Sequence, residues 1–181
     1  MTMIFGLSGS LRQGSYNTAL LRAAADLMPA GATLDIGTIA GIPLYDGDLE
    51  DASFPAAAEA LKARIAAADG VLLVTPEYNN SIPGVFKNAI DWTSRPPTDS
   101  ARVWAGRKVA LIGASPSGFG TILSQNAWLP VLRTLGAELW SGGRLMISRA
   151  QDMFDAEGKL TDPTTEDRLR QFLAGFVASL G

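Results

Sequence analysis

The feature that most constrains the fold of this chain is a repeated alternation of short apolar runs with longer segments of helical pattern. Val71–Val74 is continuously apolar, as expected of a strand that is covered on both faces. Pro55–Ala68 consists mostly of strong helix formers, and its proline suits the first helical turn. Alternation of this kind predicts a parallel sheet with helices on both faces.

The same pattern divides the whole chain into expected strands, helices and loops. Strands are expected at Met3–Gly6, Thr33–Ile39, Val71–Val74, Lys108–Gly113 and Glu138–Ile147. Helices are expected at Asn17–Met28, Pro55–Ala68, Gly84–Trp92, Thr121–Leu135 and Pro163–Leu180. Gly41–Phe54 is rich in Gly, Pro and Asp and is expected to be a loop. Pro130 is expected to kink or interrupt the helix that contains it.

The length of 181 residues is that of one domain, and no repeat, low-complexity tract or linker divides the chain. We therefore expect residues 1–181 to form a single doubly wound α/β domain. Flavodoxin-like and Rossmann-like strand orders both agree with the alternation, and periodicity does not choose between them. In either fold, ligands bind beyond the carboxyl ends of the strands.

Two residue types, Cys and His, are absent, and their absence excludes several kinds of chemistry. The chain can form no disulfide, no thiolate nucleophile and no Ser-His-Asp triad. Zinc sites rich in Cys and His are excluded as well, and no metal site is expected. Any chemistry must come from carboxylates, hydroxyls, Lys, Arg, Tyr, backbone amides or a bound cofactor.

The charge balance argues against further classes of partner. The chain has 15 Lys and Arg against 18 Asp and Glu, which gives a net charge of −3. This mildly acidic balance provides no electrostatic reason to bind nucleic acid or an anionic membrane surface. No segment is long and apolar enough to span a bilayer, and the N-terminus lacks the pattern of a secretory signal. A cytoplasmic location is the simplest expectation.

Three loops of unusual composition follow the first, third and fourth expected strands, at Ser8–Thr18, Thr75–Pro83 and Ser115–Thr121. The carboxyl ends of parallel strands meet at one edge of a sheet, so we expect the three loops to converge. A ligand site is expected where they meet.

The first of these loops is equipped to bind a phosphate group. It leads into a helix, and the free N–H groups of a helix N-terminus favour an anion. Capping of that helix by Ser15–Thr18 is the alternative interpretation, but the number of donors favours a terminal phosphate monoester. The loop supplies one cation, Arg12, and several uncharged donors: Ser8, Ser10, Ser15, Asn17 and Thr18.

Two other phosphate-binding motifs are not satisfied by this loop. Gly9 and Gly14 have the spacing of a Walker A motif, but Ser15 stands where that motif requires Lys. The dinucleotide-binding fingerprint of three glycines is also absent. A nucleoside triphosphatase is therefore not expected.

The second loop is suited to a flat heteroaromatic ligand with a polar edge. Pro76 turns the chain out of the strand, and Tyr78 offers a planar face. Asn79, Asn80 and Ser81 are turn formers that carry both donors and acceptors. Backbone amides in such a loop can bind the polar edge of a ligand without any titratable side chain, which suits a chain without His or Cys.

Three segments of the chain resemble the signatures of the NADPH-dependent FMN reductase family. They are GSLRQGSYN at Gly9–Asn17, PEYNNSIPGVFKNAIDW at Pro76–Trp92 and GASPSGFGT at Gly113–Thr121. The family includes bacterial quinone, chromate and azo-dye reductases with a flavodoxin-like fold. The matches fall in order on three strand ends, and the resemblance extends over the whole chain.

The resemblance implies a flavodoxin-like five-stranded sheet of order 2-1-3-4-5, with FMN as the cofactor. It implies that the first loop holds the FMN phosphate, that the second lies along the isoalloxazine ring and that the third borders the flavin. The residues implied as FMN ligands are Ser10, Arg12, Ser15, Tyr16, Asn17, Thr18, Pro76, Glu77, Tyr78, Asn79, Ser115, Ser117, Gly118 and Gly120.

The implied activity is a ping-pong transfer of hydride from NADPH or NADH to FMN, followed by reduction of small acceptors such as quinones. Chromate, azo compounds and free flavin are further candidate acceptors. The flavin carries this chemistry, so no side chain is assigned as catalytic. The family also implies a homodimer or homotetramer. This chain has Leu123 where the family pattern commonly has Arg, which leaves the form of the oligomer open.

Two other functions remain open on the same fold. A flavodoxin-type electron carrier binds FMN but has no nicotinamide site and serves protein partners. Such carriers tend to be far more acidic than this chain, and their phosphate loops usually lack an Arg at the place of Arg12. A non-enzymatic scaffold is the third possibility, and the complete set of three flavin loops argues against it.

Overall fold

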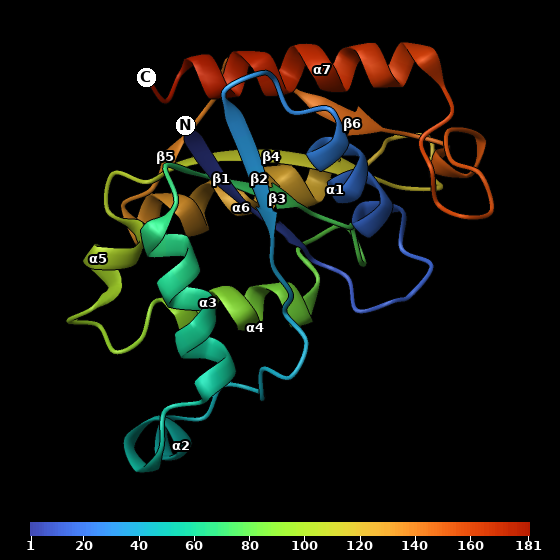
Figure 1. The fold of residues 1–181 in the computed structure, drawn as a ribbon. Coiled ribbons are helices and arrows are strands. Elements are labelled where there is room, and N and C mark those ends of the chain that lie inside the picture. The colour runs from blue at the N-terminus through green and yellow to red at the C-terminus, as the bar shows by residue number, and fades with distance from the viewer.

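The computed structural model describes all of residues 1–181 and contains one parallel sheet between two layers of helices (Figure 1). The strands are β1 (Thr2–Ser8), β2 (Ala32–Ile36), β3 (Gly70–Val74), β4 (Lys108–Ala114), β5 (Glu138–Leu139) and β6 (Leu145–Ile147). The helices are α1 (Tyr16–Asp26), α2 (Gly47–Ala52), α3 (Ala56–Ala67), α4 (Gly84–Thr93), α5 (Ser100–Trp104), α6 (Ile122–Leu135) and α7 (Pro163–Ala178), with a short 3-10 turn η1 (Ala150–Asp152).

The strands follow the order β2-β1-β3-β4-β5, every pairing is parallel, and β6 also pairs with β4. This order confirms the flavodoxin-like prediction over the Rossmann-like one. The first four expected strands and all five expected helices are present, with ends that differ by at most three residues from those predicted. No helix combines the length and the apolar character needed to cross a membrane.

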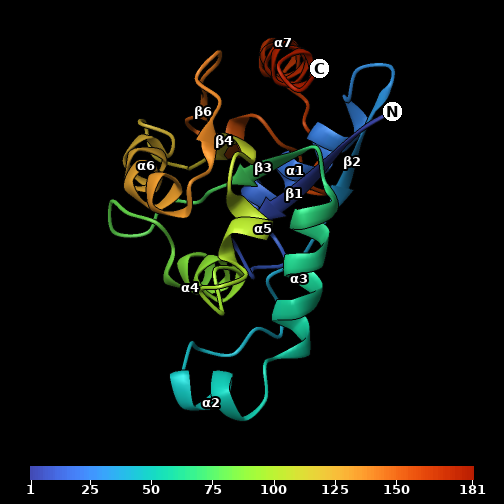
Figure 2. The ribbon, with the colours of Figure 1, turned by 90° about the vertical axis from the view of Figure 1, so that its left-hand side faces the viewer.

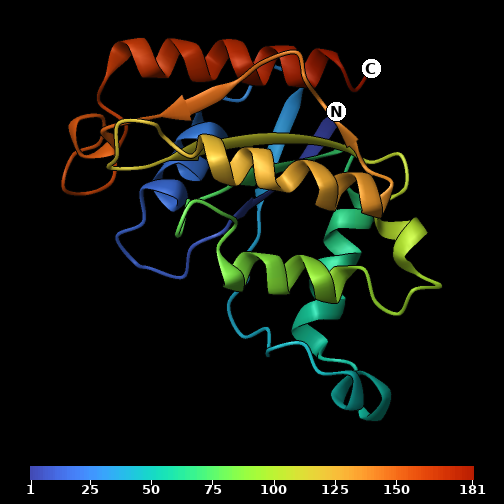
Figure 3. The ribbon, with the colours of Figure 1, turned by 180° about the vertical axis from the view of Figure 1, so that it is seen from behind.

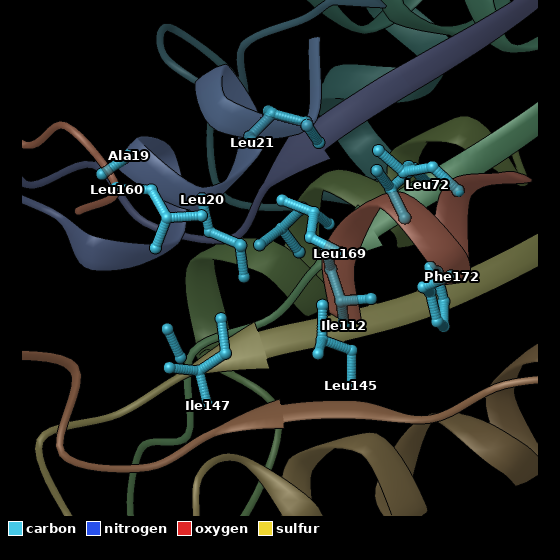
Figure 4. Packing of buried hydrophobic residues seen from close by; sticks show 14 of the residues in the cluster. Ala19, Leu20, Leu21, Leu72, Ile112, Leu145, Ile147, Leu160, Leu169 and Phe172 are labelled. Atoms are coloured by element: carbon cyan, nitrogen blue, oxygen red, sulfur yellow. The ribbon is translucent and has the colours of Figure 1, made fainter. Parts of the chain in front are cut away.

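Two hydrophobic cores lie on opposite faces of the sheet, because successive side chains of a strand point to opposite faces. Leu72 and Ile112 point to the core under α1 and α7, where they pack with Leu20, Leu169 and other residues (Figure 4). The neighbouring side chains of β1, β3 and β4 point to the core under α3, α4, α5 and α6. Figure 2 views the sheet from its end, with α7 on one side and α3 and α4 on the other.

The segment Gly41–Phe54, expected to be a loop, contains the short helix α2, which projects from the body of the molecule (Figure 3). Asp46 caps this helix, and none of its residues is buried. The carboxylate of Glu50 accepts hydrogen bonds from the Tyr45 hydroxyl (2.8 Å) and from Arg95 Nε (2.7 Å). The bond from Arg95 holds the pKa of Glu50 below its ordinary value. These contacts, and not an apolar periodicity, fix the helix, so the sequence pattern missed it.

The helices differ from the expectations in two further respects: Pro130 does not interrupt its helix, and one short helix was not expected. The helix α6 continues through Pro130 without interruption. Proline removes the bond to the carbonyl of Asn126, but both residues are exposed and water can satisfy that carbonyl. The short helix α5 was not predicted, since a segment of five residues shows no periodicity.

The expected fifth strand, Glu138–Ile147, is divided into β5 and β6. Between them the indole of Trp140 lies against the backbone of Gly142 and Gly143, where no Cβ would fit. The same ring packs edge-on against Phe172 of α7, with 5.0 Å between the ring centroids. The packing of Trp140 therefore turns the chain out of the sheet between the two short strands.

Candidate functional site

The carboxyl ends of β1, β3 and β4 lie side by side, because the strand register pairs Ser8 with Val74 and Val74 with Ile112. Hydrogen bonds continue past the strand ends, from Gly9 N–H to the Val74 carbonyl (2.9 Å) and from Thr75 N–H to the Ile112 carbonyl (2.8 Å). The three loops therefore converge as predicted. Between them lies a cavity of about 80 Å³, the three-loop pocket, lined by Ser10, Arg12, Ser15, Tyr16, Asn17, Pro76, Glu77, Tyr78, Ala114, Ser115 and Pro116.

Most of the predicted FMN ligands line this pocket. Those outside its lining are Thr18, Asn79, Ser117, Gly118 and Gly120. Ala114 and Pro116 line the pocket without having been singled out from the sequence. Both residues are next to Ser115, at the end of the apolar run of β4. Their position in the chain could have indicated them, whereas their side-chain chemistry could not.

The N-terminus of α1 borders the three-loop pocket and carries no acidic residue in its first turn. Ser15 is the N-cap, and its Oγ accepts a hydrogen bond from the Thr18 N–H (3.3 Å), so the capping interpretation is confirmed for this residue. Arg12 is exposed and forms no ion pair in the structure. The N–H groups of the first turn that Ser15 does not cap, together with the unpaired guanidinium, favour an anion here.

Three other hydroxyl groups form hydrogen bonds inside the first loop. Thr18 Oγ1 donates to Ser8 Oγ (3.0 Å), which draws the start of α1 against the end of β1. Ser10 Oγ accepts from the Arg12 N–H (3.2 Å), so its own proton remains available to a ligand.

Asn17 joins the first loop to the third. Its side chain is buried, with Nδ2 donating to the Ala114 carbonyl (2.8 Å) and Oδ1 accepting from the Ala114 N–H (2.9 Å). Both ends of the amide are thus bound to the backbone at the end of β4, directly before Ser115. Asn17 therefore fixes the relative position of two walls of the pocket.

The second loop contains a tight two-residue turn. Tyr78 and Ser81 exchange two backbone hydrogen bonds of 3.1 Å each, and Asn79 and Asn80 between them have φ of 50° and 62°. Asn is among the few residues that adopt this left-handed conformation readily, and pairs of this kind are typical of tight hairpin turns. The turn leaves Tyr78 45% exposed, so its ring is accessible beside the pocket.

Glu77, the only carboxylate of the pocket lining, is bound to the start of α6. Its Oε2 accepts hydrogen bonds from the N–H groups of Leu123 (2.8 Å) and Ser124 (3.0 Å). Its charge is therefore partly compensated by two backbone donors, which reduces its repulsion of an anion in the pocket.

The third loop is folded by its own serines and by the chain that follows β6. Ser115 Oγ lies 2.8 Å from Ser117 Oγ and accepts from the Ser117 N–H (3.0 Å). The N–H groups of Arg149 and Ala150 donate to the carbonyls of Ser117 and Ser115, each at 3.1 Å. Arg149 is thus an exposed cation beside the third loop that sequence reasoning missed, although its place after the last strand was a usable signal.

A larger cavity of about 270 Å³ lies elsewhere, between α6 and the strands β5 and β6. Its lining is mainly apolar and includes one unpaired cation, Arg144. No helix N-terminus borders it apart from the start of α6, where Glu77 already binds. The smaller three-loop pocket contains Arg12 and the N-terminus of α1, which favour a phosphate, and Tyr78, whose ring is accessible. It therefore fits a flavin with a phosphate better than the larger cavity does.

Comparison with known proteins decides the family. The model of the family described as NADPH-dependent FMN reductase matches residues 2–152. The chain belongs to this family. The predicted family, the oxidoreductase class and the cofactor FMN are thereby confirmed.

Similarity to known relatives extends over nearly the whole chain. This chain is 44% identical over 170 residues to an NAD(P)H-dependent FMN reductase of Pseudomonas aeruginosa, and the alignment covers 94% of this chain and 90% of the relative. It is 41% identical over 170 residues to a 2-hydroxy-1,4-benzoquinone reductase of a Burkholderia species, covering 94% and 91%. Among solved structures, the flavoenzyme NAD(P)H:(acceptor) oxidoreductase FerB of Paracoccus denitrificans has a TM-score of 0.89 at 33% identity, covering 99% and 97%.

We expect the variant Asn17→Ala to be strongly destabilised. It leaves the buried N–H and carbonyl of Ala114 without partners, which costs roughly 2–4 kcal/mol. Urea unfolding of the apoprotein measures this cost. Gln171→Ala, at an exposed position of α7, serves as the control and should change the free energy of unfolding by about 0.5 kcal/mol or less. Equal stability of the two variants would contradict the bridging role of Asn17.

Proposed function

We propose that this protein holds FMN in the three-loop pocket and uses NAD(P)H to reduce small quinones. The observation that carries the proposal is the N-terminus of α1, which has no acidic residue in its first turn, beside the unpaired Arg12 at the meeting point of three loops. When bound there, FMN would supply the chemistry, accepting hydride from the nicotinamide and passing electrons to the acceptor.

The FMN phosphate is assigned to the first loop. Arg12 provides the positive charge, and the hydroxyls of Ser10 and Ser15 lie with it in the lining of the pocket. Tyr16 and Asn17 line the same region, and Thr18 supports it from within. The other proposed contacts lie in the second loop, with Pro76, Tyr78 and Asn79 towards the ring and Glu77 bound through Oε2 to α6, and in the third, with Ser115, Ser117, Gly118 and Gly120.

The protein side chains orient the reactants and transfer no proton in this proposal. The pocket lining contains no His, Cys or Lys, and its one carboxylate is bound to α6. Because Tyr78 is accessible, a nicotinamide and then an acceptor can reach the same site in turn, which supports a ping-pong order. Quinones are favoured as acceptors because relatives named quinone reductase occur in Pseudomonas putida and Escherichia coli, at 39% identity each.

We also propose that copies of the chain associate through α6. Ile122, Leu129 and Leu139 are 46%, 42% and 37% exposed and line one cavity, so these apolar side chains lie near one another at the surface. Contiguous exposed apolar surface marks interaction sites, which supports the expected homodimer or homotetramer. Light scattering coupled to size-exclusion chromatography should give a dimer or tetramer, and a monomeric mass would contradict this assignment.

The phosphate assignment predicts that Arg12→Ala lowers the affinity for FMN by about 10- to 100-fold, the worth of one hydrogen bond to a charged group. Riboflavin, which has the ring but no phosphate, should bind both proteins equally. Titration of apoprotein with each flavin measures this difference. Arg22→Ala removes an exposed cation of α1 outside the pocket and should leave both affinities unchanged. Undiminished FMN affinity of Arg12→Ala would refute the assignment.

The proposed activity predicts that NADPH or NADH rapidly bleaches the flavin absorbance near ~450 nm when mixed anaerobically with the FMN-loaded protein. Addition of a benzoquinone should then restore the yellow colour. Stopped-flow absorbance follows both phases. A flavin that stays yellow with both nicotinamides would indicate the flavodoxin-type carrier instead.

A further inference from the structure

We propose that Glu77 is a positioning residue, which fixes the ring loop (Pro76–Ser81) by capping α6. The inference rests on the proposed FMN site and adds to it a role for one side chain. Family resemblance counts Glu77 among the direct ligands and does not assign it this role.

The helix α6 has no cap from its own sequence. Its N-cap residue Thr121 makes no side-chain capping bond, and its first turn contains no acidic residue. The Oγ1 of Thr121 accepts instead from Gln125 Nε2 (3.1 Å), one turn into the helix. The N–H groups of Leu123 and Ser124 therefore find their side-chain acceptor in Glu77, at 2.8 and 3.0 Å. A carboxylate is also the charge that a helix N-terminus favours.

Buried hydroxyls bind the same two segments together just before Pro76. Thr75 Oγ1 lies 2.8 Å from Ser124 Oγ and accepts a hydrogen bond from Trp128 Nε1 (3.1 Å). All three side chains are fully buried. The neighbouring Gly113 has no room for a Cβ between the Thr75 carbonyl and the side chain of Thr121. Close packing thus joins the start of α6 to the ends of β3 and β4.

The ring loop is consequently attached to α6 on both sides of Pro76, at Thr75 and at Glu77. These two attachments fix the backbone that leads to Tyr78, the part of the loop that lines the pocket. The third loop leads directly into α6. The hydrogen bonds of Glu77 to α6 therefore also connect the second loop to the third. Both backbone bonds are accepted by Oε2, so this oxygen holds the ring loop against the start of α6, which argues for positioning.

Glu77→Ala and Glu77→Gln separate the two roles. Hydrogen exchange of the Leu123 and Ser124 amides in the apoprotein should accelerate by about tenfold in Glu77→Ala, because the cap is lost. Glu77→Gln keeps one oxygen acceptor and should retain most of the protection. Affinities for FMN and for riboflavin should both fall by a similar factor in Glu77→Ala, because the ring loop moves, and both should recover in Glu77→Gln. This pattern differs from that of a phosphate ligand, which affects FMN alone.

Asp162→Ala is the matched control, since Asp162 caps α7 by accepting from the Thr165 N–H (2.7 Å) on an element outside the pocket. It should lower the melting temperature about as much as Glu77→Ala and leave both flavin affinities unchanged.

Two results would overturn the proposal. Weaker flavin binding by Glu77→Ala with unchanged exchange at Leu123 and Ser124 would mean that Glu77 contacts the flavin directly. Faster exchange with unchanged flavin affinities would mean that the cap does not position the ring loop. If the unmodified protein bound no flavin at all, the proposed function would fail, whereas the exchange measurement would still report on the cap.

Discussion

The ligand end of this protein depends on the register of three parallel strands. The pairs Ser8–Val74 and Val74–Ile112 align the carboxyl ends of β1, β3 and β4 at the same edge of the sheet. One further backbone bond beyond each strand, donated by Gly9 and by Thr75, carries this alignment into the loops. A shift of one residue in any of these strands would turn its side chains to the wrong core and separate the loops. Packing of the two cores therefore also sets the geometry of the pocket.

The N-terminus of α1 borders the pocket, whereas the N-terminus of α6 is joined to the pocket lining through Glu77. The first turn of α1 lacks an acidic residue and lies beside the free guanidinium of Arg12, so its positive end remains available to an anion. The first turn of α6 is compensated by Glu77, which comes from a loop 46 residues earlier. An anionic ligand is consequently directed to α1 and away from α6.

The sequence predicts the sheet and the three loops because those depend on local pattern. Apolar runs, small-residue loops and helix formers identify the strands and their order along the chain, and resemblance to the FMN reductases supplied the strand order in space. The bonds that complete the pocket depend instead on partners distant in sequence. Asn17 is implied as an FMN ligand by the resemblance, but the sequence gives no sign that its amide also binds the backbone of Ala114, 97 residues away. The cap that Glu77 provides and the break that Trp140 makes before β6 are equally non-local, so no window of residues reveals them.

The central claim is that the FMN phosphate binds at the N-terminus of α1 with the ring along the second loop. A crystal structure of the complex with FMN tests it most directly. We expect the phosphate oxygens within hydrogen-bond distance of Arg12 and Ser15, and the isoalloxazine ring beside Tyr78. A phosphate bound to Arg144 in the larger cavity along α6, with the three-loop pocket empty, would contradict the claim.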